Sequence, residues 1–182
     1  RGVSRHQDRL DKGWAISKED HEEDIEIIKE VGANTIRLAH YQHDQYFYSL
    51  CDKTGFAVWA EIPFISVFNT SKKAHDNTIS QMRELVAQNY NHPSILFWGI
   101  SNEITIAGES EALYQNLTEL HSLVKSMDPI RLTTMAEVTI TPKNSEHVYI
   151  TDILSYNHYF GWYVGDVEDN GSWLDEFHRI NP

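Results

Sequence analysis

The sequence predicts an α/β fold: an incomplete (β/α)8 or TIM barrel with about six βα units, in a single domain that covers residues 1–182. Strand-like and amphipathic helical segments alternate six times with short connections, which favours a parallel sheet with helices outside it. Polar groups follow most predicted strands, where a barrel places its functional side chains. The first strand leads into Arg5-His6-Gln7 and not into the glycine-rich phosphate loop typical of a doubly wound sheet.

Local patterns place the elements of the first half. Residues 1–6 are extended, and Ser17 with Asp20 three residues later resembles a capping box that starts a helix ending near Gly32. β-branched and apolar runs, caps and helix breakers then predict a strand at 34–39, a helix at 44–55, a strand at 56–63 and a helix at 77–90.

The stretch 95–103 organises the second half. It is apolar and aromatic before it ends on Ser-Asn-Glu, which predicts a strand buried on both faces with Asn102 and Glu103 at its carboxyl end. A helix at 110–127, a strand at 131–136, a short helix or loop at 142–147, a strand at 150–156 and a helix at 172–180 follow.

The composition of the chain excludes several classes of partner. With 15 basic and 27 acidic residues the net charge is −12, which argues against nucleic acid and anionic membrane surfaces as partners. No apolar run approaches the roughly 20 residues that span a bilayer. The single Cys51 excludes an internal disulfide and leaves the compartment open between bacterial periplasm and cytoplasm. The 5 Trp, 9 Tyr and 7 Phe suit a sugar-binding cleft as well as a core.

Reactive side chains at the strand ends suggest polyol recognition, because a barrel brings all these ends to one mouth. Glycoside cleavage needs a carboxylic acid for the leaving oxygen and a second carboxylate opposite it. The strand-end groups are His6, Arg37, His40, Glu61, Asn102, Glu103, Glu137, Asn157, His158 and Tyr159.

The segments 1–6, 36–41, 98–103 and 159–163 resemble successive motifs of glycoside hydrolase family 2, in that family's order. The resemblance implies a retaining (β/α)8 enzyme in which Glu103 is the acid/base catalyst. It makes Asn102 the amide that contacts the substrate hydroxyl beside the anomeric carbon, and it places the remaining substrate-binding groups at His6, Arg37, His40 and Tyr159.

The first two motifs resemble the β-galactosidase branch, so we expect a parent protein that cleaves terminal β-D-galactosides. Two alternatives stay open: a β-glucuronidase of the same family, whose groups for the substrate carboxylate lie beyond residue 182 in that branch, and a non-catalytic carbohydrate-binding barrel. In each case the expected partner is a carbohydrate.

The resemblance also implies missing parts. The family's nucleophile is a Glu at the end of strand seven, so we expect no nucleophile in this chain, strands seven and eight and the flanking β-domains to be absent, and the fragment alone to be inactive. Arg37, a charge in an apolar strand, needs a carboxylate partner, which the resemblance makes the missing nucleophile or a neighbour of it. The open edges of such a barrel favour association, so a homo-oligomer is a further prediction.

We expect no cofactor. The segment 65–67, which matches the position of magnesium ligands in metal-dependent relatives, is Ile-Ser-Val and has no carboxylate or His. His40 and His43 have a spacing that could hold a metal, but no further ligand stands nearby in the sequence, so substrate binding by His40 is the stronger interpretation. His21 is expected on a solvated helix face.

Overall fold

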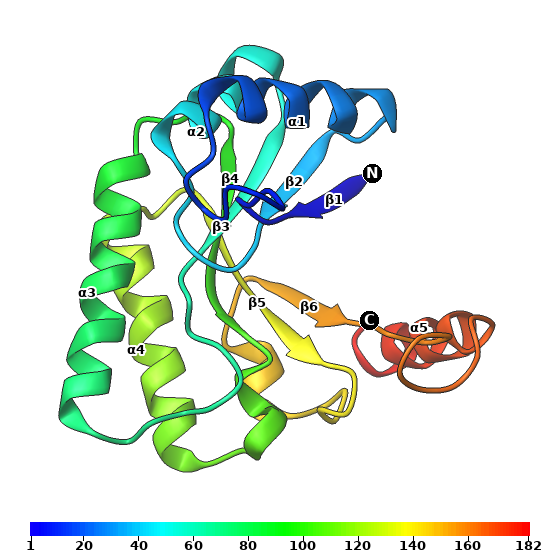
Figure 1. The fold of residues 1–182 in the computed structure, drawn as a ribbon. Helices are drawn as coiled ribbons and strands as arrows, with labels where there is room; N and C mark the ends of the chain where they lie inside the picture. The colour runs from blue at the N-terminus through cyan, green and yellow to red at the C-terminus, as the bar shows by residue number, and fades with distance from the viewer.

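The computed structural model describes residues 1–182 and confirms the α/β class. Six parallel strands lie in one sheet in the order β1-β2-β3-β4-β5-β6, and four of the five α-helices pack on its outer face as an incomplete TIM barrel (Figure 1). The strands are β1 (Gly2–Arg5), β2 (Thr35–Leu38), β3 (Ala57–Glu61), β4 (Ile95–Asn102), β5 (Leu132–Val138) and β6 (Ile153–Asn157). The helices are α1 (Lys18–Glu30), α2 (Gln45–Thr54), α3 (Lys72–Asn89), α4 (Glu111–Met127) and α5 (Asp169–Ile180), with short 3-10 turns η1 (Ile104–Ala107) and η2 (Glu146–Tyr149).

The helix ends follow their capping residues. Ser17 and Asp20 form the predicted capping box at the start of α1, and Gly55 ends α2 in the left-handed conformation with φ of 78°. Helix α3 begins at Lys72, five residues before the predicted start, because the Ser71 hydroxyl accepts a hydrogen bond from the Ala74 amide.

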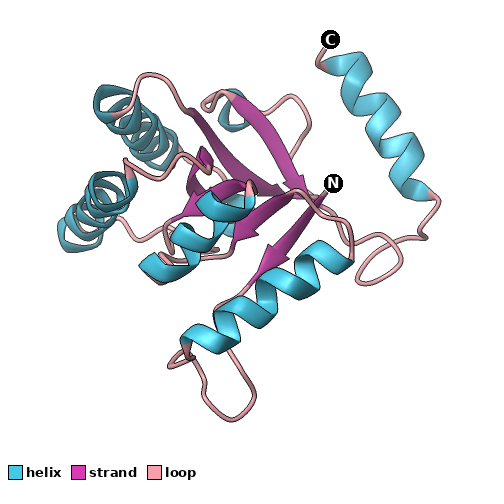
Figure 2. Ribbon diagram, turned by 90° about the horizontal axis from the view of Figure 1, so that it is seen from above, coloured by secondary structure: helices cyan, strands magenta, loops and turns pink.

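The core lies between the sheet and its helices, which Figure 2 shows around the strands. Outward-facing strand residues meet the apolar faces of α1 to α4, and α3 and α4 run side by side (Figure 1). Helix α5 lies beyond β6, and Trp173 and Phe177 pack their rings against Tyr156. No helix has the length and apolar character needed to cross a membrane.

Strand β4 differs from its prediction in one respect. Ile95, Trp98 and Ile100 are fully buried, but Leu96 is 46% exposed and Phe97 is only half-buried. Phe97 lines an open cavity of about 330 Å³ along the inner face of the sheet, which also borders β1, β2, β5 and β6. The inner face of β4 is therefore only partly covered at Phe97 within the six strands.

Candidate active site

Glu103 follows β4 directly and has an unusual backbone. Its φ of 49° and ψ of 29° lie in the left-handed region, which costs a non-glycine residue on the order of 1 kcal/mol or more. Its amide donates to the Ala136 carbonyl of β5 at 2.7 Å, and its carbonyl accepts from the Ile106 amide at 3.0 Å. The strained conformation is thus held on both sides, as is common for residues at functional sites.

Two donors from the end of β6 hold the Glu103 carboxylate. Asn157 donates from Nδ2 to Oε1 at 2.6 Å, and the Tyr159 hydroxyl donates to the same oxygen at 2.8 Å. Burial, followed by the hydrogen bond to Glu103, raises the pKa of Tyr159 to about 12, so the phenol keeps its proton at ordinary pH. The carboxylate therefore has a fixed orientation at the carboxyl ends of β4 and β6.

A second carboxylate, Glu61 at the end of β3, is fully buried, and both of its oxygens have hydrogen-bond partners. Arg37 donates to it from two nitrogens, Nε at 2.9 Å and an Nη at 3.1 Å, and His40 Nδ1 lies 2.5 Å from Oε1. The Arg37 guanidinium also lies 4.5 Å from the Trp59 ring centre. The carboxylate partner of Arg37 within this chain is thus Glu61, and a contact of Arg37 with the missing nucleophile stays a prediction.

Asn102 and Asn157 connect the two carboxylates. The Asn102 side-chain oxygen accepts from Arg37 at 2.7 Å and from Asn157 Nδ2 at 3.0 Å. Arg37 donates to the Asn157 side-chain oxygen at 2.9 Å. A continuous hydrogen-bonded network therefore runs from Glu61 to Glu103 across β2, β3, β4 and β6.

The structure brings together all six side chains predicted for the site. Arg37, His40, Asn102, Glu103 and Tyr159 belong to this network, and the His6 ring stands edge-on to His40 at 5.2 Å. Their roles toward substrate stay predictions. Asn157 and Glu61 were predicted as strand-end groups but were not assigned to the site, and the structure places both in the network.

Two other strand-end groups point away from the mouth. Glu137 lies within β5, which continues two residues beyond its predicted end, and its side chain is buried against Thr105 and Thr141. His158 packs against the rings of Tyr156 and Trp173. Side chains alternate across a strand, so the neighbour of an inward-facing residue faces the helices.

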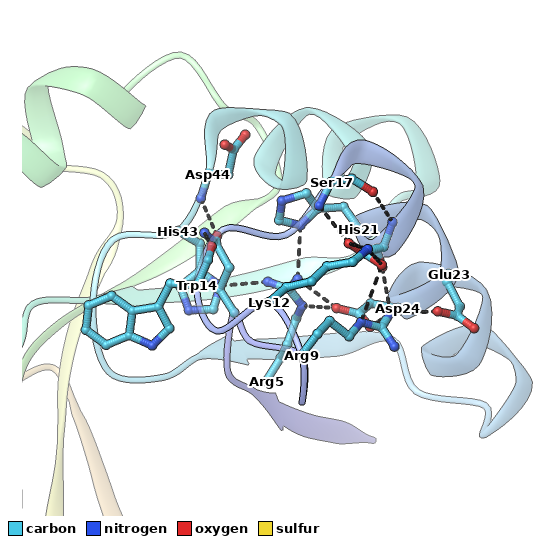
Figure 3. A network of polar contacts seen from close by, with 12 residues as sticks. Arg5, Arg9, Lys12, Trp14, Ser17, His21, Glu23, Asp24, His43 and Asp44 are labelled. Carbon is cyan, nitrogen blue, oxygen red and sulfur yellow. Dashed lines mark hydrogen bonds and ion pairs between the residues drawn. The ribbon is translucent and has the colours of Figure 1, made fainter.

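Behind the mouth, Arg5 is the centre of a buried polar cluster (Figure 3). It donates to Asp24 from Nε at 2.8 Å and from its two terminal nitrogens to His21 and His43, each at 3.0 Å. His21 is therefore buried by its contact with Arg5, and the expected solvated position is wrong.

His43 has no free nitrogen for a metal. Its Nδ1 accepts from Arg5, which fixes the tautomer, and its Nε2 donates to the Ala39 carbonyl at 3.1 Å. Burial lowers the pKa of His43 to about 3. The bond to Ala39 reaches the residue that precedes His40, so this cluster supports the strand ends that carry His6 and His40. Residues 1–182 contain no cluster of three or more His, Cys, Asp or Glu side chains that could hold a metal.

A parallel barrel with a carboxylate held at the end of strand four, beside an amide and a buried Arg–Glu pair, defines a candidate sugar-processing barrel. Residues 1–181 match the family described as glycosyl hydrolases family 2, TIM barrel domain. The chain belongs to this family, as its motifs predicted.

Individual relatives show which members of the family the chain resembles. The crystal structure of an FMN-binding β-glucuronidase from Facaelibacterium prausnitzii L2-6 is 62% identical, with a TM-score of 0.98 over 100% of this chain and 28% of that one. A β-glucuronidase of Bacteroides fragilis is 39% identical over 100% of this chain and 26% of its own length. Bacteroides uniformis β-glucuronidase 2, solved covalently bound to cyclophellitol-6-carboxylate aziridine, is 35% identical with a TM-score of 0.92 over 98% of this chain and 23% of that one.

The chain thus spans about a quarter of the length of these relatives. Their names support the β-glucuronidase alternative better than the β-galactosidase branch that the first two motifs suggested.

Proposed function

We propose that this chain carries the acid/base half of the catalytic barrel of a retaining β-glucuronidase. The observation that carries the proposal is the Glu103 carboxylate, held at the end of β4 by Asn157 and Tyr159. Glu103 protonates the departing glycosidic oxygen and later removes a proton from the water that releases the sugar. Asn102, Arg37, His40 and His6 bind and orient the sugar ring.

The nucleophile is a carboxylate outside residues 1–182. The second carboxylate of the mouth, Glu61, is fully buried, and its two oxygens already meet Arg37 and His40. A nucleophile must have a free oxygen that can approach the anomeric carbon, and Glu61 has none in this arrangement. Glu61 instead orients Arg37 and His40 toward the sugar.

A glucuronide is the better-supported substrate. Relatives at 62% and 39% identity are named β-glucuronidases, and the covalent ligand of a third carries a 6-carboxylate. A galactoside is the second candidate, because the motifs at β1 and β2 resemble those of β-galactosidases. Those motifs are short, so they separate the two substrates less well than similarity over the whole chain.

The test uses the protein with its complete barrel. We expect turnover of 4-nitrophenyl β-D-glucuronide with a kcat/KM at least tenfold above that for the β-D-galactoside. The opposite ratio assigns the galactosidase function, and binding of glucuronate without turnover of either substrate assigns a non-catalytic barrel.

Glu103→Gln tests the acid/base role. Only poor leaving groups need a proton donor, so the variant should cleave an alkyl glycoside about 10²-fold or more slower, with a much smaller loss in the glycosylation step of a 2,4-dinitrophenyl glycoside. Glu111→Gln, an exposed carboxylate at the start of α4, is the matched control and should change neither rate. Equal losses on the two substrates would remove Glu103 from this role.

A further inference from the structure

Glu137 is a buried carboxylate that the proposed mechanism does not use. Its side chain faces the helix side of β5 and is only 2% exposed. Oε2 accepts hydrogen bonds from the hydroxyls of Thr105 and of Thr141, the latter at 3.2 Å, and the two hydroxyls lie 2.9 Å apart. Burial raises the pKa of this carboxyl, and Oε1 has no hydrogen-bond partner.

This contact lies directly behind the acid/base residue. Thr105 is two residues after Glu103, in the turn η1, and its carbonyl closes that turn by accepting from the Gly108 amide at 2.8 Å. The Glu103 amide bonds to the carbonyl of Ala136, the residue before Glu137. Two successive residues of β5 therefore fix Glu103 and the turn that follows it.

The backbone of Glu103 needs such support. Its left-handed conformation is strained, so it persists only if contacts with the surrounding structure hold it in place. The Thr105 hydroxyl provides the side-chain contact between η1 and β5, and it needs an acceptor in a buried place. An apolar residue at position 137 would cost less to bury, but it would remove the acceptor that the Thr105 and Thr141 hydroxyls share and leave each hydroxyl only the other as a partner.

We propose that Glu137 is a positioning residue for Glu103: through Thr105 it fixes the turn η1, and thereby the direction of the Glu103 carboxylate. The inference rests on the acid/base role proposed above. Glu137 itself touches no substrate, because it is buried on the helix side of the sheet, away from the mouth.

The test compares two substrates in the protein with its complete barrel. A misplaced proton donor slows cleavage of an alkyl β-glucuronide, which needs the proton, far more than the glycosylation step of a 2,4-dinitrophenyl β-glucuronide. For Glu137→Ala we expect a loss of about 10²-fold in kcat/KM on the alkyl substrate and about threefold or less on the dinitrophenyl substrate. Glu137→Gln, which retains an acceptor oxygen, should restore most of the alkyl activity.

Asp128→Asn is the matched control for a purely structural effect. Asp128 is also a buried carboxylate, 1% exposed, but it precedes β5 at the far end of the barrel, where it bonds to Trp98 and Arg131. This variant should lower the unfolding midpoint and reduce both rates by the same factor. Equal loss on the two substrates for Glu137→Ala, or no loss on either, would overturn the inference.

A second pair of variants covers the case in which Glu137→Ala does not fold. Thr105→Ala removes the hydroxyl and should give the same selective loss, whereas Thr105→Ser keeps the hydroxyl and should not. If both Thr105 variants behave alike, Glu137 has no positioning role. Glu103→Gln run alongside separates the two proposals: if it shows no preference between the substrates, the acid/base assignment itself fails.

Discussion

The hydroxyl of Tyr159 and the carboxylate of Glu103 lie 2.8 Å apart, although 56 residues separate them in the chain. The bond joins the ends of β4 and β6, two strands separated in the sheet by β5. Because the pKa of Tyr159 is raised to about 12, its proton remains available to Glu103 at any pH at which an enzyme of this kind would act. The orientation of the proposed proton donor thus depends on a residue of another βα unit.

Tyr159→Phe tests this dependence in the protein with its complete barrel. A hydrogen bond to a charged group contributes about 1.5–3 kcal/mol, which corresponds to a loss of roughly 10- to 100-fold in kcat/KM on an alkyl glycoside. Tyr46→Phe is the matched control, because it removes a phenol–carboxylate bond to Glu22 on the outer surface. If both variants retain full activity, the Tyr159 hydroxyl does not orient the catalytic carboxylate.

The Arg37–Glu61 pair gives a prediction for stability. Arg37→Met leaves the fully buried Glu61 without its two-point partner, and breaking a buried ion pair from one side typically costs about 3–5 kcal/mol. Arg37→Lys keeps the charge but not the planar two-point geometry, and should lie between wild type and Met. Urea unfolding of the wild type, Arg37→Met and Arg37→Lys measures the three unfolding free energies.

Arg179→Met is the control for that series. Arg179 is exposed, and its nearest carboxylate oxygen, on Glu176, is 3.9 Å away. An exposed pair of this kind contributes little, so the unfolding free energy should change by less than about 0.5 kcal/mol. An Arg37→Met protein as stable as this control would show that Glu61 tolerates the loss of its partner.

Much of the fold could be predicted because its signals are local. Ser17 and Gly55 mark helix ends through their own chemistry, and the apolar run before Glu103 identifies a buried strand. Position at a strand end then indicated ten candidate groups, and the resemblance to glycoside hydrolase family 2 selected from them the six side chains that the structure gathers at the mouth. The strand-end inference needs only the period of each element and the geometry of a parallel barrel.

Pairings between strands could not be predicted in the same way. Arg37 pairs in register with Trp59, so Glu61 lies two residues further along β3 on the same face, but the sequence does not give that register. The burial of His21 and His43 depends on Arg5, which meets them from another segment of the chain. The branch of the family could not be fixed by the short motifs of β1 and β2, which suggested β-galactosidases, whereas relatives similar over the whole chain are named β-glucuronidases.

His43 gives a prediction for pH dependence. Its folded-state pKa of about 3 lies below the ordinary 6.5, so the neutral imidazole contributes stability above pH 6.5 that is lost as the pH falls toward 3. One such group adds a slope of up to about 1.4 kcal/mol per pH unit across that window. His43→Gln should lower stability at pH 7 and flatten the acid slope, measured as urea midpoints between pH 4 and 7.

The control for His43 is His178→Gln on the exposed face of α5. It should leave both the midpoint at pH 7 and the acid slope unchanged. An acid slope for His43→Gln that equals the wild-type slope would mean that His43 does not titrate on unfolding in this range, and that other groups cause the acid sensitivity.

Gly99 on β4 gives the last prediction. A Cβ atom at this position would lie 2.4 Å from Trp59 Nε1 and 2.5 Å from the Glu61 Cβ, so Gly99→Ala must displace the side chains that hold Arg37. We expect a loss of about 1–3 kcal/mol in unfolding free energy and a lower kcat/KM, because the Arg37–Glu61 geometry shifts. Gly171→Ala is the control: nothing lies within 4 Å of its Cβ position in α5, and alanine there should stabilise by about 0.5–1 kcal/mol. Equal behaviour of the two variants would mean that the mouth has room to rearrange around Trp59.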